Sequence, residues 1–211
     1  MSHKLYLYPK WIRLWHLFNA LLFLTLITTG ISMQYTDKES ANTFIIKFDR
    51  SVAIHNFAAL LLTLNYIIFV TGNVLTKNRI HYRINWKTIW KDLLIQFKYY
   101  AYGMFKGQKH PFPVTETTKF NPLQKFVYVL AMFVGLPLLI ISGVGLLFPE
   151  ITIKGIFGVS GLILTDILHI TTGFFLSLFM IIHIYTCTLG SKPLTLFKSM
   201  ITGYHESDDE H

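Results

Sequence analysis

The chain has 211 residues, of which 52% are hydrophobic and only 14% are charged. An ordinary soluble domain carries about 25% charged residues, so the composition argues against a soluble enzyme and favours a protein whose solvent is lipid. The single cysteine excludes a disulfide framework and a Cys-x-x-Cys-His haem attachment motif. The net charge of +8 does not indicate a nucleic-acid-binding face, because the basic residues lie between apolar runs.

Four apolar stretches are long enough to span a membrane as helices. They cover about residues 11–34, 51–75, 122–148 and 162–189. No small-x-small cleavage site follows the first stretch, so we interpret it as a span and not as a signal peptide. The sequence therefore predicts an all-α integral membrane protein, a four-transmembrane-helix bundle in which residues 1–211 form a single membrane domain.

The long connection between the second and third spans is the most basic part of the chain. Within it, about residues 86–106 repeat apolar side chains at helical spacing, with lysines between them. This pattern predicts a helix that lies in the cytoplasmic membrane interface or docks onto a partner subunit, and it favours neither alternative.

Lysine and arginine crowd the N-terminus, the long connection and the segment after the fourth span. Four spans place these three segments on one side, which the positive-inside rule identifies as the cytoplasm. Both termini are therefore predicted to be cytoplasmic, in a multi-pass protein of the bacterial cytoplasmic (inner) membrane. The acidic tail after Tyr204 is predicted to fray.

Four histidines lie inside the predicted spans, where ionisable side chains are costly and mark candidate functional sites. His169 and His183 share the fourth span and are 14 residues apart. On a helix this separation is roughly 21 Å along the axis and about 40° around it, so the two imidazoles share a face at two depths. His16 lies early in the first span and His55 lies early in the second.

The predicted topology pairs these histidines by depth. His16 and His183 fall toward the cytoplasmic side, and His55 and His169 fall toward the outer side. Two bis-histidine sites stacked across a four-helix bundle are the arrangement expected for two b-type haems, each with two imidazoles as axial ligands of its iron.

Other interpretations of these histidines are weaker. A single intramembrane histidine is often a hydrogen-bonded core residue or a proton relay, but four that pair by depth favour ligation. A structural zinc ion needs four ligands at one place, whereas these histidines divide two and two. The glycines in the spans serve either close approach of a flat macrocycle or helix packing. The other five histidines fall in polar segments and require no cofactor.

The histidines and their surroundings resemble the di-haem cytochrome b family. The matching features are Trp11-Ile-Arg-Leu-Trp-His16, His55, the pair in the fourth span and Met200-Ile-Thr-Gly-Tyr204. That family includes the gamma subunits of respiratory formate dehydrogenases and the cytochrome b subunits of nickel-iron hydrogenases and thiosulfate reductases. The resemblance covers nearly the whole chain, is most specific for the formate dehydrogenase gamma type, and implies the same ligand pairing.

A further stretch, Lys119-Phe-Asn121-Pro-Leu-Gln124-Lys125, resembles the family segment that enters the third span. The resemblance implies that Asn121 helps to bind a menaquinone or other quinone beside the haem of His16 and His183. Here Pro122-Leu123 replaces an alanine and a glycine of the family pattern. The competing interpretation is that Asn121 is a helix N-cap before a proline at the first helical position.

The expected function is that of a membrane cytochrome b subunit of a respiratory oxidoreductase. It would carry electrons between an extracytoplasmic redox subunit, such as an iron-sulfur protein or multihaem cytochrome, and a quinone site near the cytoplasmic face. The sequence allows either direction of flow and holds no site of its own for a non-quinone substrate. The alternatives are a stand-alone quinol:cytochrome linker, a haem-free histidine-relay transporter and a passive membrane anchor.

Overall fold

Residues 3–36, 44–156, 158–188 and 194–207 are described in this computed structural model. In these ranges four helices are long and apolar enough to cross a membrane, which confirms the predicted helical membrane fold. They are α1 (Lys10–Tyr35), α2 (Phe48–Leu75), the span Pro122–Leu147 and α6 (Gly161–Thr186). The predicted end of the fourth span at residue 189 lies outside the described residues.

The chain divides into two compact units. Unit one comprises residues 1–10, 72–135 and 182–211, and unit two comprises residues 11–71 and 136–181. The boundaries fall at the ends of α1 and α2 and within the other two spans, and each unit is described by itself below. The single domain expected from the sequence stays a prediction.

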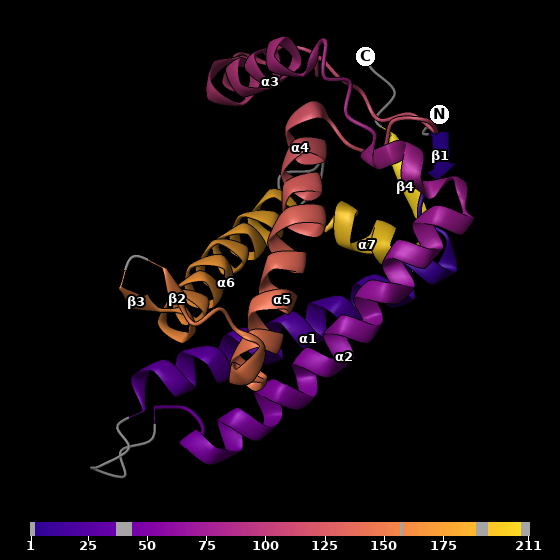
Figure 1. Cartoon of the computed structure of the whole chain (residues 1–211). Coiled ribbons are helices and arrows are strands. Elements are labelled where there is room, and N and C mark those ends of the chain that lie inside the picture. Colours follow the sequence, from indigo (N-terminus) through magenta and orange to yellow (C-terminus); the bar gives the residue numbers. More distant parts are fainter. Residues whose placement is uncertain (1–2, 37–43, 157, 189–193, 208–211) are drawn as a thin grey trace. The chain divides into compact units, whose positions relative to one another are not determined.

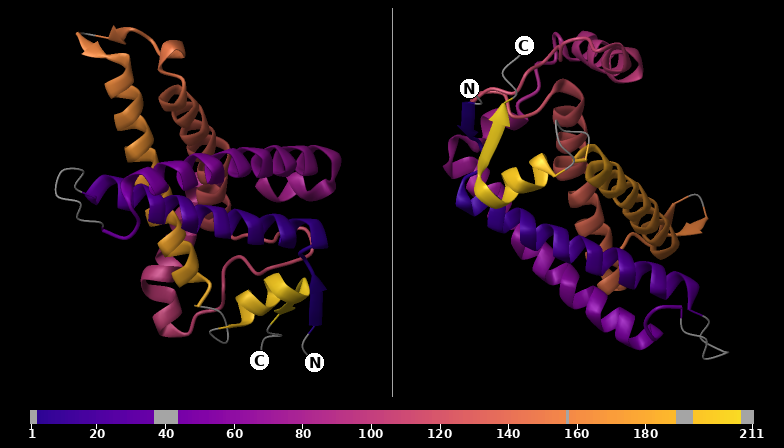
Figure 2. Two further views of the ribbon diagram at one scale, coloured as in Figure 1. Left: turned by 90° about the horizontal axis from the view of Figure 1, so that it is seen from below. Right: turned by 180° about the vertical axis from the view of Figure 1, so that it is seen from behind.

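In unit two, α1 and α2 lie side by side (Figures 1 and 2). Near one end, the Trp15 indole donates a hydrogen bond to the Asn65 carbonyl at 3.0 Å and stacks on Phe69 with ring centroids 4.4 Å apart. Near the other end, the Ser32 hydroxyl donates to the Ile46 carbonyl at 2.7 Å. The Trp15 contacts hold the two helices together where hydrophobic packing alone provides little specificity, and the Ser32 hydrogen bond ties α1 to the residues just before α2.

The third span is interrupted by a short π-helical turn. It consists of α4 (Pro122–Leu130), the turn Ala131–Gly135 and α5 (Leu136–Leu147). Pro137 has no amide hydrogen to donate and its ring clashes with the preceding helical turn, so a regular α-helix is disfavoured here. The π-turn absorbs the resulting irregularity, as such turns commonly do.

A short hairpin precedes α6 in unit two. Its strands are β2 (Gly155–Ile156) and β3 (Val159–Ser160), which pair antiparallel. Gly158 in the connection has φ +79°, a backbone conformation that glycine adopts without strain.

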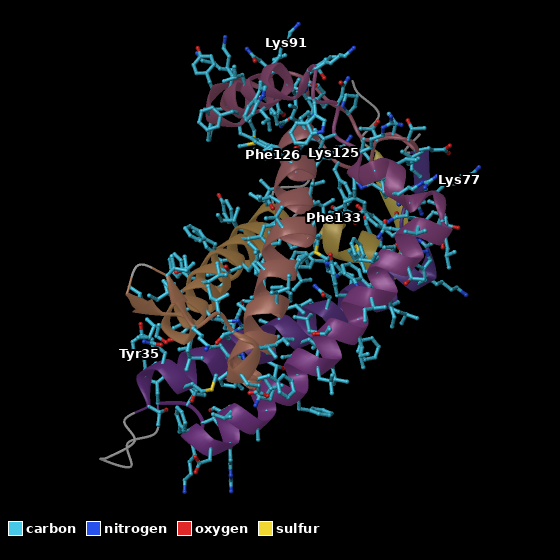
Figure 3. The ribbon with its side chains drawn as sticks, in the orientation of Figure 1. Tyr35, Lys77, Lys91, Lys125, Phe126 and Phe133 are labelled. Carbon is cyan, nitrogen blue, oxygen red and sulfur yellow. The ribbon has the colours of Figure 1, made fainter. Side chains whose placement is uncertain are left out.

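In unit one, α3 (Ile89–Lys98) lies across the N-terminal end of α4 (Figure 1). The two helices meet where Trp90 faces Phe126, with ring centroids 6.3 Å apart. Lys91 lies on the side of α3 away from α4 (Figure 3). The α-helix is shorter than the predicted 86–106, because residues 86–88 form a turn and a π-helical turn, Tyr99–Gly103, follows the helix.

The two ends of the chain meet in unit one. Strand β1 (His3–Tyr6) pairs antiparallel with β4 (Tyr204–Ser207), which follows α7 (Thr195–Thr202) (Figure 2). Gly203 joins α7 to β4 with φ +89°, and a Cβ there would lie 2.9 Å from the Tyr8 carbonyl. Of the acidic tail predicted to fray, Glu206 and Ser207 lie in this strand, and residues 208–211 lie outside the described residues.

Candidate functional site

Two of the four predicted ligands lie together in unit two. His55 on α2 and His169 on α6 face each other with ring centroids 6.3 Å apart and ring planes inclined by 67°. These residues are 114 positions apart in the sequence, so their approach is a property of the fold. The predicted outer-side pair is thus brought together.

A hydroxyl group orients each of these two imidazoles. His55 Nδ1 lies 2.8 Å from Thr29 Oγ1, and His169 Nδ1 lies 3.0 Å from Ser142 Oγ. Each hydroxyl donates its only hydrogen to a carbonyl of its own helix, that of Thr25 at 2.8 Å and that of Leu138 at 2.7 Å.

The hydroxyl oxygens can therefore only accept, and each Nδ1 must donate. A neutral imidazole protonated at Nδ1 carries its free lone pair on Nε2. Fixing the tautomer in this way is what groups behind metal-ligating histidines usually do. Both rings are thus prepared to bind a metal through Nε2.

The spacing of these rings suits one metal atom held from opposite sides. Two imidazoles that each bind a metal at about 2.0–2.1 Å place their ring centroids about 6 Å apart, close to the spacing of His55 and His169. No group of three or more His, Cys, Asp or Glu side chains suited to a metal occurs in the described ranges. Two opposed imidazoles at this spacing suit a metal whose remaining ligands come from a bound group such as a porphyrin.

A glycine follows each orienting hydroxyl and lies against the same imidazole. A Cβ added at Gly143 would lie 3.2 Å from His169 Cε1, and one at Gly30 would lie 3.7 Å from His55 Cε1. In both Thr29-Gly30 and Ser142-Gly143, the hydroxyl contacts Nδ1 of the imidazole and the glycine leaves room for its Cε1. The third span supplies no histidine, but through α5 it supplies one of these pairs.

The other two predicted ligands fall in different units. His16 on α1 belongs to unit two and follows Trp15, whose contacts with α2 fix the first turns of the helix. His183 on α6 belongs to unit one, where its Nδ1 lies 3.2 Å from the Tyr128 hydroxyl. Cys187 Sγ lies 4.0 Å from His183 Nε2, one helical turn further on.

Asn121 is the N-cap of α4. Its side-chain oxygen accepts from the Gln124 amide at 2.9 Å, and the Gln124 side chain accepts from the Asn121 amide at 3.3 Å, which completes a capping box with Pro122 in the first turn. Its side-chain nitrogen donates to the Tyr100 hydroxyl at 2.9 Å. The capping interpretation is confirmed, and both polar atoms of the side chain have protein partners.

Lys119, two residues before this cap, is a buried cation. It is 9% exposed, its ammonium donates to Asn78 Oδ1 at 3.1 Å, and it lies 5.7 Å from the centre of the Tyr8 ring. Asn78 in turn donates to Asn73 Oδ1 at 2.9 Å. Burial lowers the pKa of Lys119 to about 8, so this side chain exchanges its proton closer to neutral pH than an exposed lysine does.

His81 was expected to be an ordinary polar-segment residue, but it is only 6% exposed and its Nδ1 has no hydrogen-bond partner. Burial and the nearby Lys119 lower its pKa from 6.5 to about 4. Between about pH 6.5 and pH 4, His81 binds more protons in the unfolded chain than in the folded chain. The free energy of unfolding therefore decreases as the pH falls through this range.

We therefore expect acidification from pH 7 to pH 5 to destabilise the native protein by about 2 kcal/mol through this residue. A His81→Leu variant should lose less stability over the same change. Melting temperatures in detergent at the two pH values measure the difference. Equal losses for both proteins would show that His81 is not an acid-sensitive group.

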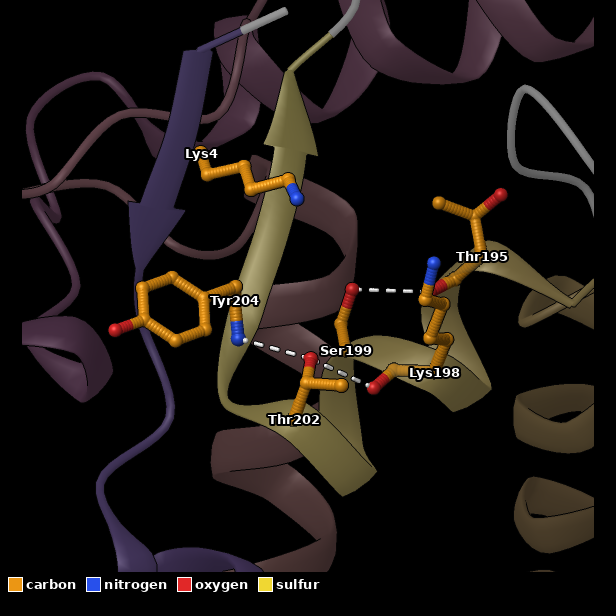
Figure 4. A pocket seen from close by; sticks show the side chains of 6 residues that line it. All are labelled: Lys4, Thr195, Lys198, Ser199, Thr202 and Tyr204. Carbon is orange, nitrogen blue, oxygen red and sulfur yellow. Dashed lines mark hydrogen bonds between the residues drawn. The ribbon is translucent and has the colours of Figure 1, made fainter.

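A shallow pocket in unit one contains none of the predicted site residues. Its lining residues are Lys4, Thr195, Lys198, Ser199, Thr202 and Tyr204 (Figure 4). The hydroxyls of Ser199 and Thr202 donate to carbonyls of α7, at 2.9 and 3.0 Å. Both hydroxyls are thus used in hydrogen bonds within α7, and we assign no ligand to this pocket.

Sequence reasoning missed the hydroxyls that orient the imidazoles. A hydroxyl residue followed by glycine is the common feature of Thr29-Gly30 and Ser142-Gly143, but Thr71-Gly72 and Thr172-Gly173 share it. The dipeptide therefore does not show which of these hydroxyl residues orients an imidazole.

Comparisons with known proteins point to one family. A family described as prokaryotic cytochrome b561 matches residues 7–203. A protein described as "Putative cytochrome YdhU", from Escherichia coli (strain K12), is 37% identical over 204 residues, which are 97% of this chain and 76% of that protein. No solved structure matches.

Proposed function

We propose, given that this chain belongs to the prokaryotic cytochrome b561 family, that it is the membrane cytochrome b subunit of a respiratory oxidoreductase complex. Membership makes it a multi-pass membrane cytochrome b, for which haem b is the cofactor and electron transfer the role. The proposal adds two haems, a quinone site, an extracytoplasmic redox partner and a place in the bacterial cytoplasmic membrane.

The facing imidazoles of His55 and His169 carry the proposal. Their 6.3 Å separation and Nδ1 contacts fit the two axial positions of one haem. A haem with two imidazole ligands supplies reversible one-electron transfer and keeps no open position for oxygen. The Thr29 and Ser142 hydroxyls hold the rings in the ligating tautomer.

His16 and His183 are proposed as the ligands of a second haem. The support is their place inside two spans, at the depth that the predicted topology assigns to the cytoplasmic side. The Tyr128 hydroxyl, 3.2 Å from His183 Nδ1, is suited to orient that ring. The quinone is proposed to bind in unit one, near the start of α4.

The proposal is tested on protein purified in detergent. A reduced-minus-oxidised spectrum should show a b-type band, and a haem assay against protein concentration should give two haems per chain. A chemically reduced sample should be reoxidised by a soluble naphthoquinone. Absence of the b-type band would overturn the cytochrome assignment, and one haem per chain would overturn the second site.

Gly143 should be the more sensitive of the two glycines at the proposed outer haem. In Gly143→Ala the new methyl group would lie 3.2 Å from Cε1 and 3.6 Å from Nδ1 of His169, so the ring must shift. A displaced ligand typically weakens metal binding by about tenfold or more.

We therefore expect Gly143→Ala to retain less haem than the native chain after detergent washing. The matched control is Gly30→Ala, whose methyl group would make only an ordinary contact, at 3.7 Å, with His55. Haem retention that is equal in the two variants would mean that Gly143 serves only helix packing.

A further inference from the structure

Helix α3 carries an exposed stripe of large apolar side chains. Trp90, Leu94 and Phe97 are 66%, 70% and 64% exposed. They are spaced four and three residues apart, so on a regular helix they fall within about 60° of one another around the axis. These three side chains form the apolar face of α3.

The apolar face lies between a buried face and a charged face of the same helix. Ile89 and Gln96, about 120° around the axis on one side, are buried. Lys91 and Lys98, about 80° around the axis on the other side, are exposed. Because the two lysines are seven residues apart, they share one face, the lysine face of α3.

The depth of α3 along the third span favours lipid as the occupant of the apolar face. Trp90 contacts Phe126 with ring centroids 6.3 Å apart. Phe126 follows Pro122, the first residue of that span, by four residues, so it lies roughly 6 Å into the span. Interfacial helices bury their apolar faces about 5–10 Å into the boundary between headgroups and acyl chains. Tryptophan is also enriched at this level of a membrane.

The lysine face is suited to the headgroups above that boundary. Lys91 lies on the side of α3 away from α4, and therefore away from the hydrocarbon that α4 enters (Figure 3). A lysine can lay its methylene chain along lipid and keep its ammonium among the headgroups, where it attracts anionic lipids. A water-soluble protein partner would reach the lysine face but not an apolar face at this depth.

We propose that α3 is a lipid-binding helix, whose apolar face lies among acyl chains at the start of the third span and whose Lys91 and Lys98 bind the phosphates of anionic phospholipids. The helix thereby holds the long connection and the start of α4 at the membrane surface. This site uses neither a haem nor a quinone, so its failure would leave the proposed function untouched.

The first test measures the depth of spin labels on full-length protein in vesicles of phosphatidylcholine and phosphatidylglycerol. Labels are attached to Leu94→Cys on the apolar face and to Lys91→Cys on the lysine face, each combined with Cys187→Ser to remove the native thiol. The ratio of collisions with oxygen to collisions with a water-soluble nickel complex should be several times higher at position 94, because oxygen concentrates in hydrocarbon.

Two outcomes of this test would overturn the proposal. Equal ratios at positions 94 and 91 would mean that the apolar face lies in water. A label at position 94 that is shielded from both reagents would mean that the face packs against protein, such as a second copy of this chain.

The second test measures the binding of phosphatidylglycerol to full-length protein in detergent by native mass spectrometry, with phosphatidylcholine as the neutral comparison. Lys91→Gln combined with Lys98→Gln should weaken phosphatidylglycerol binding by roughly fivefold and leave phosphatidylcholine binding unchanged. The matched control combines Lys47→Gln with Lys154→Gln, at two exposed lysines of other connections, and should keep the native affinity. Equal phosphatidylglycerol binding by the two double variants would overturn the headgroup assignment.

Discussion

Replacing His169 with alanine is expected to lower the haem content from two per chain to about one. His169 lies opposite His55 with ring centroids 6.3 Å apart, so under the proposed assignment the loss of either ring would leave the iron with one protein ligand in place of two. A b-type haem has no thioether bonds to hold it in place, so the remaining ligand should not retain it through purification. A haem assay on the purified variant measures the loss.

The partner substitution sharpens this test. His55→Ala should lose the same haem, and the double variant should lose no more than either single variant, because both changes act on one site. His110→Ala, in an exposed segment, is the control and should keep the native haem content. If the double variant held no haem while each single variant held one, His55 and His169 would belong to different sites.

Replacing His183 with alanine is expected to remove the other haem and to slow quinone reduction by at least about a hundredfold. The reason is that the proposed quinone site lies in the same unit as His183, so the electron route to it depends on this ligand. Stopped-flow reoxidation of the reduced protein by a naphthoquinone measures the rate, and the haem assay measures the cofactor.

The matched control for His183 is its neighbour Cys187. Its sulfur lies 4.0 Å from His183 Nε2, so Cys187→Ser alters the same surroundings without removing an imidazole. This variant should keep both haems and most of the quinone rate. A His183→Ala protein with two haems and native quinone kinetics would show that His183 is not a ligand.

Much of the fold could be predicted because lipid restricts the possibilities. Each span must satisfy its own backbone, so long apolar runs become helices, and Pro122 marks the start of one of them. The histidines stood out for a related reason, since an imidazole inside a span is rare. The sequence pattern does not give the distance between two histidines on different spans. The fold places the His55 and His169 rings 6.3 Å apart.

The orienting hydroxyls could not be selected from the sequence. A serine or threonine inside a span usually bonds a carbonyl of its own helix, as Thr63 and Ser177 do at 2.9 and 2.7 Å. Thr29 and Ser142 make the same bond and accept from an imidazole as well. That second partner comes from another helix, and no local pattern records it.

Gln96 shows a different limit. Helical periodicity in the long connection predicted an amphipathic helix, and a glutamine there is most simply assigned to its polar face. In the structure α3 lies across α4 and this glutamine is fully buried. Its position depends on how two helices pack, which the spacing of apolar residues in one of them does not determine.

The pairing of β1 with β4 also bears on how the chain is made. These strands lie outside the four spans at opposite ends of the sequence, so they can pair only if an even number of segments has crossed the bilayer. During synthesis β1 emerges first, and its partner β4 follows only after the fourth span has been made. The two-stranded sheet therefore closes only on a chain whose four described spans have been inserted. A misinserted chain would instead leave the hydrogen-bonding edge of β1 unpaired.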